Sequence, residues 1–244
     1  VGQVFRLAAA GAHTPEPVAF GNVRIGAATS QNLSLTNLSA NDGFSEKLNA
    51  SLGGASAGIT AGGAFNLLGP QATDSTSLHV GIDTASAGAK SGTATITLVS
   101  DGTGTSGLGQ TALASQTVNV SGNVYRLASP LLNTGSVDLA ARVGAVSPSA
   151  AISITNSSPD IYTERMNASL GVAPSGFSGS GSVTGLAAGA SSSALTVGLN
   201  TTTAGSFSGA VNVNFISSGA GTTGAADASV GSQAVNLSGN VYTP

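Results

Sequence analysis

Histidine, aspartate and serine are the residue types in this chain that could take part in catalysis or metal binding. The two histidines, His13 and His79, have no second histidine or cysteine at the spacing that metal ligands use. His79 takes a solvent-facing position in a segment with strand periodicity, and His13 lies in a loop bounded by glycine and proline. We therefore expect both histidines to be surface residues without a catalytic or metal-binding role.

The aspartates and serines also lack the arrangements that chemistry needs. The aspartates are spread singly, and none belongs to the D-x-D-x-D-G pattern of a calcium loop. Asp42 and Asp160 are expected to cap turns instead, because each precedes a matched segment. No G-x-S-x-G elbow with a histidine partner occurs. The sequence therefore predicts no enzyme, no cofactor and no metal site within this chain.

Two further recurring features have a structural interpretation. The stretches Gly102–Gly104 and Gly219–Gly221 lack a lysine and a following helix, so they are predicted to be turns and not phosphate cradles. The pairs Glu46-Lys47 and Glu164-Arg165 could bind a partner. We favour the alternative that they are exposed charges on an otherwise neutral strand, which keep register and solubility.

Composition excludes several classes of protein. The chain has 244 residues with 7 Lys+Arg and 10 Asp+Glu, a net charge of −3, and its basic residues are scattered. Nucleic-acid binding needs clustered basic residues, so no nucleic-acid partner is expected. No apolar stretch approaches the roughly 18 residues that cross a bilayer, so no membrane span is expected. Cysteine is absent, so each domain must be held together by its core alone.

An internal repeat of about 118 residues determines the predicted architecture. Five pairs of segments match: Phe44–Gly53 with Tyr162–Gly171, Val4–Ala8 with Val124–Ala128, Leu33–Asn37 with Ile152–Asn156, Leu78–Thr84 with Leu195–Thr201, and Gln116–Tyr125 with Gln233–Tyr242. Changes in the offset fall between the matched segments, as expected for loops between strands. The sequence therefore predicts two domains, at residues 1–123 and 124–244.

The matched segments have the period of strands. Apolar residues alternate with Ser, Thr, Asn or His, which places one set inward and the other toward solvent. The inward set is Leu33, Leu35, Leu78, Val80, Ile82, Ala94, Ile96, Leu98, Val118 and Val120, with Ile152, Ile154, Leu195, Val197, Leu199, Val211, Val213, Phe215, Val235 and Leu237 in the second copy. Several short strands in each copy predict an all-β chain made of two tandem Ig-like antiparallel β-sandwiches.

The segments Val18–Gly26, Leu33–Asn37, Leu78–Ile82 and Gly92–Ile96 resemble the Hydin-type Ig-like domain. This family is related to PapD and major sperm protein sandwiches, and its bacterial members occur in exported proteins of the choice-of-anchor D type. The second copy departs from the pattern, with Leu139-Ala140 in place of Phe20-Gly21. The resemblance implies a sandwich of seven or eight strands in a bacterial extracellular or cell-surface protein, and it carries over no catalytic residue.

The two ends of the chain align with the junction between the copies, since Val4–Leu7 matches Val124–Leu127 and Val241–Tyr242 matches Val124–Tyr125. The chain is therefore either part of a longer array or a subunit that assembles head-to-tail. In both cases we expect a seam between domains or subunits, with Arg6 and Arg126 in contacts across it. The predicted seam residues are Val4, Phe5, Arg6, Leu7, Val124, Tyr125, Arg126, Leu127, Val241 and Tyr242.

The favoured function is a structural repeat unit of a bacterial extracellular fibre, sheath or adhesin shaft. Its partners would be copies of itself or adjacent repeats. The alternative is a module that binds a surface glycan or protein through the loops predicted at Gly53–Gly69 and Gly171–Ser191. A third possibility is an accessory domain of an enzyme whose catalytic part lies elsewhere in a longer chain.

Overall fold

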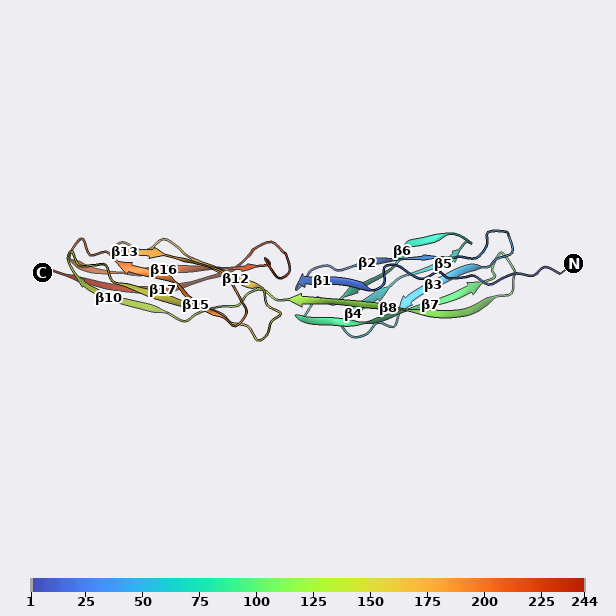
Figure 1. The fold of residues 1–244 in the computed structure, drawn as a ribbon, viewed down its shortest axis with the longest axis horizontal. Coiled ribbons are helices and arrows are strands. Elements are labelled where there is room, and N and C mark those ends of the chain that lie inside the picture. Colours follow the sequence, from blue (N-terminus) through green and yellow to red (C-terminus); the bar gives the residue numbers. More distant parts are fainter. Residues whose placement is uncertain (1, 244) are drawn as a thin grey trace. The chain divides into compact units, whose positions relative to one another are not determined.

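The computed structural model describes residues 2–243 of the chain, and all the regular elements in this range are strands (Figure 1). The chain divides between Val124 and Tyr125 into two compact units. Among the described residues, no helix has the length and apolar character needed to span a membrane.

The first unit is a sandwich of two sheets. Its strands are β1 (Val18–Arg24), β2 (Gln31–Thr36), β3 (Lys47–Gly53), β4 (Ile59–Gly62), β5 (Ala64–Leu68), β6 (Thr73–Ile82), β7 (Gly88–Asp101) and β8 (Gln110–Tyr125). One sheet has the order β1-β8-β7-β3-β5 and the other β2-β6-β4. Isolated bridges from Ala10 to Asn37 and from Thr14 to Ser34 lie along the β2 edge.

The second unit repeats this order. Its strands are β9 (Pro130–Leu132), β10 (Ser136–Arg142), β11 (Ser149–Asn156), β12 (Arg165–Leu170), β13 (Phe177–Ser180), β14 (Ser182–Leu186), β15 (Ser191–Leu199), β16 (Gly205–Ser218) and β17 (Ala228–Tyr242). The sheets are β10-β17-β16-β12-β14 and β13-β15-β11-β9. The predicted fold class of two tandem Ig-like β-sandwiches is confirmed. One local difference from the antiparallel prediction is that β10 pairs in parallel with β17.

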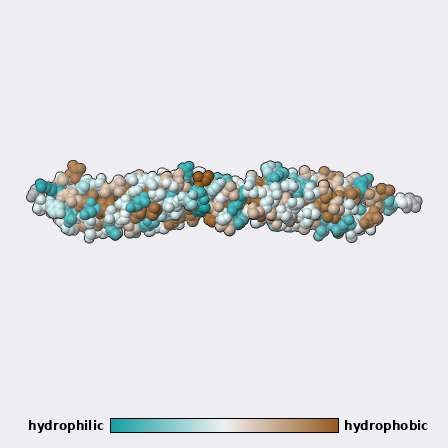
Figure 2. Space-filling view, turned by 90° about the horizontal axis from the view of Figure 1, so that it is seen from below, coloured by the Kyte–Doolittle hydropathy of each residue, from teal (hydrophilic) through white to brown (hydrophobic). Residues whose placement is uncertain are grey.

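The core of each unit consists mainly of small aliphatic side chains from the inner faces of the two sheets. All the alternating apolar residues that the sequence predicts to face inward are buried. All of them except Leu199 belong to one cluster in each unit, and Phe65 and Phe215 are among the few aromatic members. The outer faces carry mostly Ser, Thr, Asn and Gly. Figure 2 accordingly shows hydrophilic, neutral and hydrophobic residues mixed in small areas.

A single glycine carries the chain from one sheet to the other in each unit. Gly63 separates β4 from β5, and its φ of 104° lies in the left-handed region. A Cβ atom there would lie 1.8 Å from the carbonyl oxygen of Ser77. Gly181 separates β13 from β14 in the same way, with a φ of 92° and a Cβ position 2.0 Å from the oxygen of Ala194. No other residue fits these two positions without moving the neighbouring backbone.

These crossings correct one expectation from the sequence. The stretches Gly53–Gly69 and Gly171–Ser191 were predicted to be variable binding loops, but they contain β4, β5, β13 and β14. The many glycines and serines in these stretches favoured loops. The strands are only four or five residues long, which is too short for a clear alternation of apolar and polar residues. Both stretches therefore contribute strands to the sheets.

Candidate functional site

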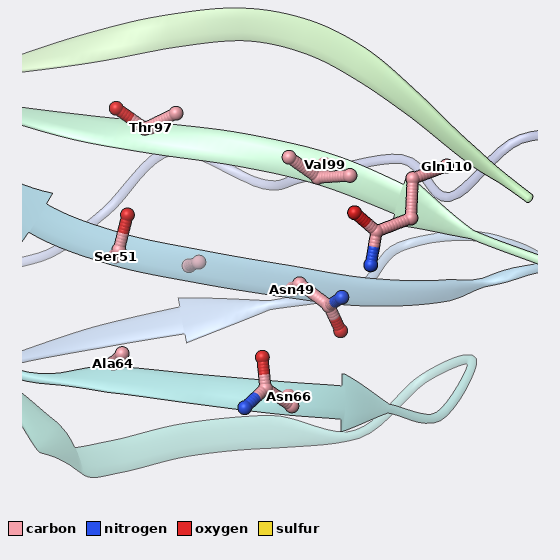
Figure 3. Close-up of a pocket in the computed structure, with 8 residues that line it drawn as sticks. Asn49, Ser51, Ala64, Asn66, Thr97, Val99 and Gln110 are labelled. Carbon is pink, nitrogen blue, oxygen red and sulfur yellow. The ribbon is translucent and has the colours of Figure 1, made fainter.

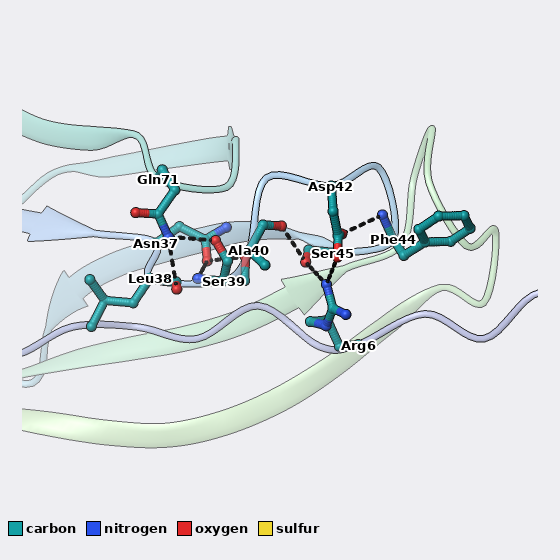
Figure 4. A network of polar contacts seen from close by, with 9 residues as sticks. All are labelled: Arg6, Asn37, Leu38, Ser39, Ala40, Asp42, Phe44, Ser45 and Gln71. Atoms are coloured by element: carbon teal, nitrogen blue, oxygen red, sulfur yellow. Dashed lines mark hydrogen bonds and ion pairs between the residues drawn. The ribbon is translucent and has the colours of Figure 1, made fainter.

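Part of the predicted seam forms an aromatic–arginine clasp in the first unit (Figure 4). Arg6 forms an ion pair of 2.5 Å with Asp42, whose other carboxylate oxygen accepts a hydrogen bond from the Phe44 backbone N–H at 3.0 Å. The hydrogen bond from Arg6 lowers the pKa of Asp42 below its usual value. The ring of Phe5 lies 5.7 Å from that of Phe44, between centroids. The clasp fixes the start of the chain to the loop that follows β2.

The second unit has an equivalent clasp. Arg126 pairs with Asp160 at 2.5 Å, and Asp160 accepts a hydrogen bond from the Tyr162 N–H at 2.9 Å. The Arg126 guanidinium lowers the pKa of Asp160. The rings of Tyr125 and Tyr162 are 5.7 Å apart in an edge-to-face arrangement. The predicted turn-capping role of both aspartates is confirmed, and each arginine pairs with an aspartate of its own unit.

The remaining seam residues differ in exposure. Val124 and Val241 are buried, at 0% and 3% exposure, whereas the equivalent Val4 is 87% exposed. Tyr242 is 59% exposed and is the counterpart of Tyr125. Leu7 and Leu127 are partly exposed in both units. Whether these residues join copies or repeats stays a prediction.

His13 is not the surface residue that the sequence suggested. It is 7% exposed because the segment before β1 folds against β8. Its Nδ1 lies 2.7 Å from Gln116 Oε1, and its Nε2 lies 2.9 Å from a Glu16 carboxylate oxygen. Leu132 makes the equivalent backbone bond to Gln233 in the second unit, so the position is structural. His79 is exposed, as predicted.

The two recurring glutamates are also buried, which overturns their interpretation as exposed charges. Glu46 and Glu164 have 3% and 0% exposure. Glu46 accepts hydrogen bonds from Ser100 Oγ at 2.7 Å and from Ser106 Oγ. Burial of a carboxylate is tolerated here because hydroxyl donors take the place of water.

The second unit preserves this network. Glu164 accepts hydrogen bonds from Ser217 Oγ at 2.8 Å and from the hydroxyl of Thr223. Ser106 and Thr223 lie in the Gly-rich turns that precede β8 and β17. The buried carboxylates therefore hold these turns against the end of each sandwich, and this role accounts for their recurrence.

The outer face of the five-stranded sheet carries a shallow groove in each unit. In the first unit it has a volume of about 210 Å³ and is lined by Asn49, Ala50, Ser51, Ala64, Asn66, Thr97, Val99 and Gln110 (Figure 3). Asp101 lies at one end of this groove and accepts 2.8 Å hydrogen bonds from Asn49 and Gln110. Hydrogen bonds from Thr103 and then from these amides hold the pKa of Asp101 well below its usual range.

The groove of the second unit occupies the matching positions and has the same volume, about 210 Å³. Its lining is Asn167, Ala168, Ser169, Ser182, Val183, Thr184, Asn214 and Ile216. Beside it lies a larger open pocket of about 490 Å³, which contains Arg165 and shares Asn167 and Thr184 with the groove. Within residues 2–243, no cluster of three or more His, Asp or Glu side chains could hold a metal ion.

No protein-family model matches the chain, and no curated protein is similar to it in sequence. Solved structures share the all-β sandwich arrangement at low identity. A Porphyromonas gingivalis W83 protein of unknown function is 10% identical, with a TM-score of 0.33 over 94% of this chain and 98% of that one. PapD-like domain 7 of human CEP192 is 10% identical, with a TM-score of 0.35 over 47% and 84%.

Mouse cadherin-23 EC22-24 is 11% identical, with a TM-score of 0.40 over 95% of this chain and 64% of that chain. These similarities concern the fold and not what the chain binds or does.

Proposed function

We propose that this chain is a structural repeat unit of a bacterial extracellular fibre, sheath or adhesin shaft. The observation that carries the proposal is the lack of any spacer between the two sandwiches. Val124 belongs to the core cluster of the first unit, and the next residue, Tyr125, packs on Tyr162 in the second unit. One strand thus completes a sandwich and begins the clasp of the following one, as expected for consecutive repeats of one chain.

The exposed seam residues support joining to further units. Val4 has the same place in the repeat as the buried Val124 and Val241, and Tyr242 has the place of the clasp residue Tyr125. Only 7% of the residues are charged, so few charges guard the sheet edges against neighbours. The bacterial and cell-surface parts of the proposal rest on the resemblance of residues 18–96 to the Hydin-type domain.

The way in which further units join depends on Phe5. Its ring already occupies the position on Phe44 that Tyr242 of a second copy would need. Docking of separate copies therefore requires displacement of the segment Val4–Leu7, whereas adjacent repeats of one longer chain do not. We expect the Phe5→Ala variant to self-associate more strongly than the unchanged chain if separate copies dock.

The test is size-exclusion chromatography and negative-stain imaging of the concentrated chain. Head-to-tail assembly predicts oligomers or filaments that Tyr242→Ser weakens. Ile161→Ser is the matched control, because Ile161 is 75% exposed but lies outside the predicted seam residues. A monodisperse 23.2 kDa monomer at high concentration, for both the unchanged chain and Phe5→Ala, would refute assembly of separate copies.

A second candidate function is a glycan- or protein-binding module. The specific observation that favours it is the Arg165 pocket and its adjoining groove, which lie on strands and not on the loops expected from the sequence.

A further inference from the structure

The basic residue that begins the third major strand has different surroundings in the two units. Lys47 of β3 pairs in register with Asp101 of β7, whose carboxylate accepts hydrogen bonds from Asn49 and Gln110. Arg165 of β12 lies opposite Ser218 of β16. Among the described residues, no carboxylate lies within ion-pairing distance of Arg165. The second unit thus has Arg165 paired with a serine where the first unit has Lys47 paired with an aspartate.

A second difference opens space beside this guanidinium. Leu67 and Gly185 are equivalent residues with left-handed φ values of 56° and 64°. Leu67 places a large side chain beside the sheet in the first unit, whereas Gly185 places none. The result in the second unit is the open pocket of about 490 Å³, lined by Arg165, Asn167, Thr184, Gly185, Ser218, Ala220 and Gly221.

One backbone carbonyl contacts the guanidinium in this pocket. An Arg165 terminal nitrogen donates a hydrogen bond of 3.4 Å to the Gly185 carbonyl oxygen. On the other side, a Cβ atom at Gly221 would lie 3.4 Å from Arg165 Nε, so the absence of a side chain there leaves room for the arginine. Five N–H donors on a planar group match a carboxylate in a bidentate geometry, and one carbonyl uses only part of this capacity.

Apart from Arg165, the polar side chains of the lining are neutral, and Ala220, Val183 and Ile216 add apolar surface. Asn167 and Thr184 belong both to the pocket and to the adjoining groove, which continues with Ser169, Ser182 and Asn214. Asn167 Oδ1 already accepts the Gly185 N–H at 2.7 Å, so its amide group is held in place with its NH₂ as a donor. An arginine followed by a row of amides and hydroxyls fits a ligand that has one carboxylate and several hydroxyl groups.

We propose that the second unit binds an acidic saccharide, with the carboxylate of a uronic acid residue on Arg165 and the sugar hydroxyls along Asn167, Thr184 and Ser218. This inference does not depend on the structural function, because the site lies wholly within one unit and involves none of the seam residues. Asp227 directly precedes Ala228, which pairs with Ser217, and its negative charge opposes the ligand.

The experiment is a titration of the full chain with a galacturonic acid trimer, followed by NMR chemical shifts or calorimetry. A galactose trimer is the matched neutral probe, and sodium sulfate is the inorganic anion. We expect the acidic trimer to bind and the neutral trimer to bind roughly tenfold to hundredfold more weakly, because charged hydrogen bonds are lost. Arg165→Lys should weaken binding of the acidic trimer by a similar factor, since lysine cannot form the two-point contact.

Three further variants replace residues of one unit by the equivalent residues of the other. Ser218→Asp and Gly185→Leu should each abolish binding, because they restore the carboxylate and the side chain of the first unit. The triple variant Lys47→Arg/Leu67→Gly/Asp101→Ser should create a second site in the first unit. Arg142→Lys, at an exposed arginine of the second unit outside the pocket, is the control and should leave the affinity unchanged.

Far-UV circular dichroism and tyrosine fluorescence establish that each variant is folded. Equal binding of the neutral and acidic trimers would overturn the proposal, as would full affinity in both Arg165→Lys and Ser218→Asp. Competition by sulfate at the same affinity as the trimer would overturn the saccharide assignment and leave a general oxyanion site.

Discussion

Replacement of Gly63 by alanine tests the sheet-crossing geometry most directly. A left-handed φ costs a non-glycine residue about 1–2 kcal/mol. In addition, the new Cβ would lie 1.8 Å from the Ser77 oxygen, whereas real Cβ contacts stay above 3.0 Å. The β6 backbone must therefore move, and overpacking of this kind costs about 1–3 kcal/mol. We expect Gly63→Ala to destabilise the first unit by about 3–5 kcal/mol, a large part of the stability of a small domain.

Two other glycines separate the two contributions to this cost. Gly43 has a φ of 84° and no heavy atom within 4 Å of its Cβ position, so Gly43→Ala should cost only the left-handed term, about 1–2 kcal/mol. Gly53 is equally open and has no left-handed φ. Gly53→Ala should therefore be neutral or stabilise by up to about 1 kcal/mol.

The assay uses the uneven distribution of tyrosine. The chain has no Trp and 3 Tyr, and all of the tyrosines lie from residue 125 onward. In urea titrations, tyrosine fluorescence therefore reports the second unit, while far-UV circular dichroism reports both. Gly63→Ala should shift only the dichroism transition, and Gly181→Ala should shift the fluorescence transition. A cost for Gly63→Ala no larger than that for Gly43→Ala would refute the close approach to Ser77.

Three more predictions use the same assay. Glu46→Gln should destabilise the first unit by about 1–2 kcal/mol, because charge-assisted hydrogen bonds from two hydroxyls become neutral ones; an unchanged midpoint would show that the buried charge is unimportant. Leu67→Gly should stabilise the first unit by roughly 0.5 kcal/mol, since relief of the left-handed φ exceeds the entropy cost of glycine, and Gly185→Leu should cost the second unit about 1–2 kcal/mol. Folding lowers the pKa of Asp101, so its contribution to stability is complete above about pH 4 and falls as the pH is lowered toward the folded pKa. In dichroism titrations, the Asp101→Asn variant should lose less stability on acidification than the unchanged chain does. An equal loss of stability in the two proteins would contradict this.

The sandwich fold could be predicted because its signal is repeated twice and has a period of two. Leu33 and Leu35 are both fully or almost fully buried, as are Ile152 and Ile154 in the second copy. Inward-facing side chains of a two-layer sandwich pack between the sheets, away from water, and are therefore apolar. The alternation of apolar and polar residues alone identifies the core for this reason. The same logic fails where a strand is short, and it therefore missed the crossings at Gly63 and Gly181.

Burial of Glu46 could not be predicted from charge, because an isolated glutamate at the start of a strand usually faces water. A signal was nevertheless present in the repeat. Ser100 and Ser106 have hydroxyl counterparts in Ser217 and Thr223, and such retention suggests donors for a shared acceptor. His13 gave no such signal, since only the folded structure brings Gln116 to its ring.

The Arg165 pocket lies between these cases. The exchanges that open it are visible when the two copies are aligned, yet they are far apart along the chain. Only the strand register places Ser218 opposite Arg165 and brings Gly185 beside them. Comparison of the two copies identifies the residues that differ, and the pairing of the strands shows that these residues lie around one pocket.

The parallel pairing of β10 with β17 has a mechanical consequence. Residues Ser136 to Arg142 pair in step with Asn236 to Tyr242, so the two strands run in the same direction along the sheet. Tension applied to the leading end of β10 and the trailing end of β17 pulls them past each other lengthwise. The backbone bonds between them then share the load at once and do not open one after another, so this ladder resists stretching far better than a hairpin peeled from its tip.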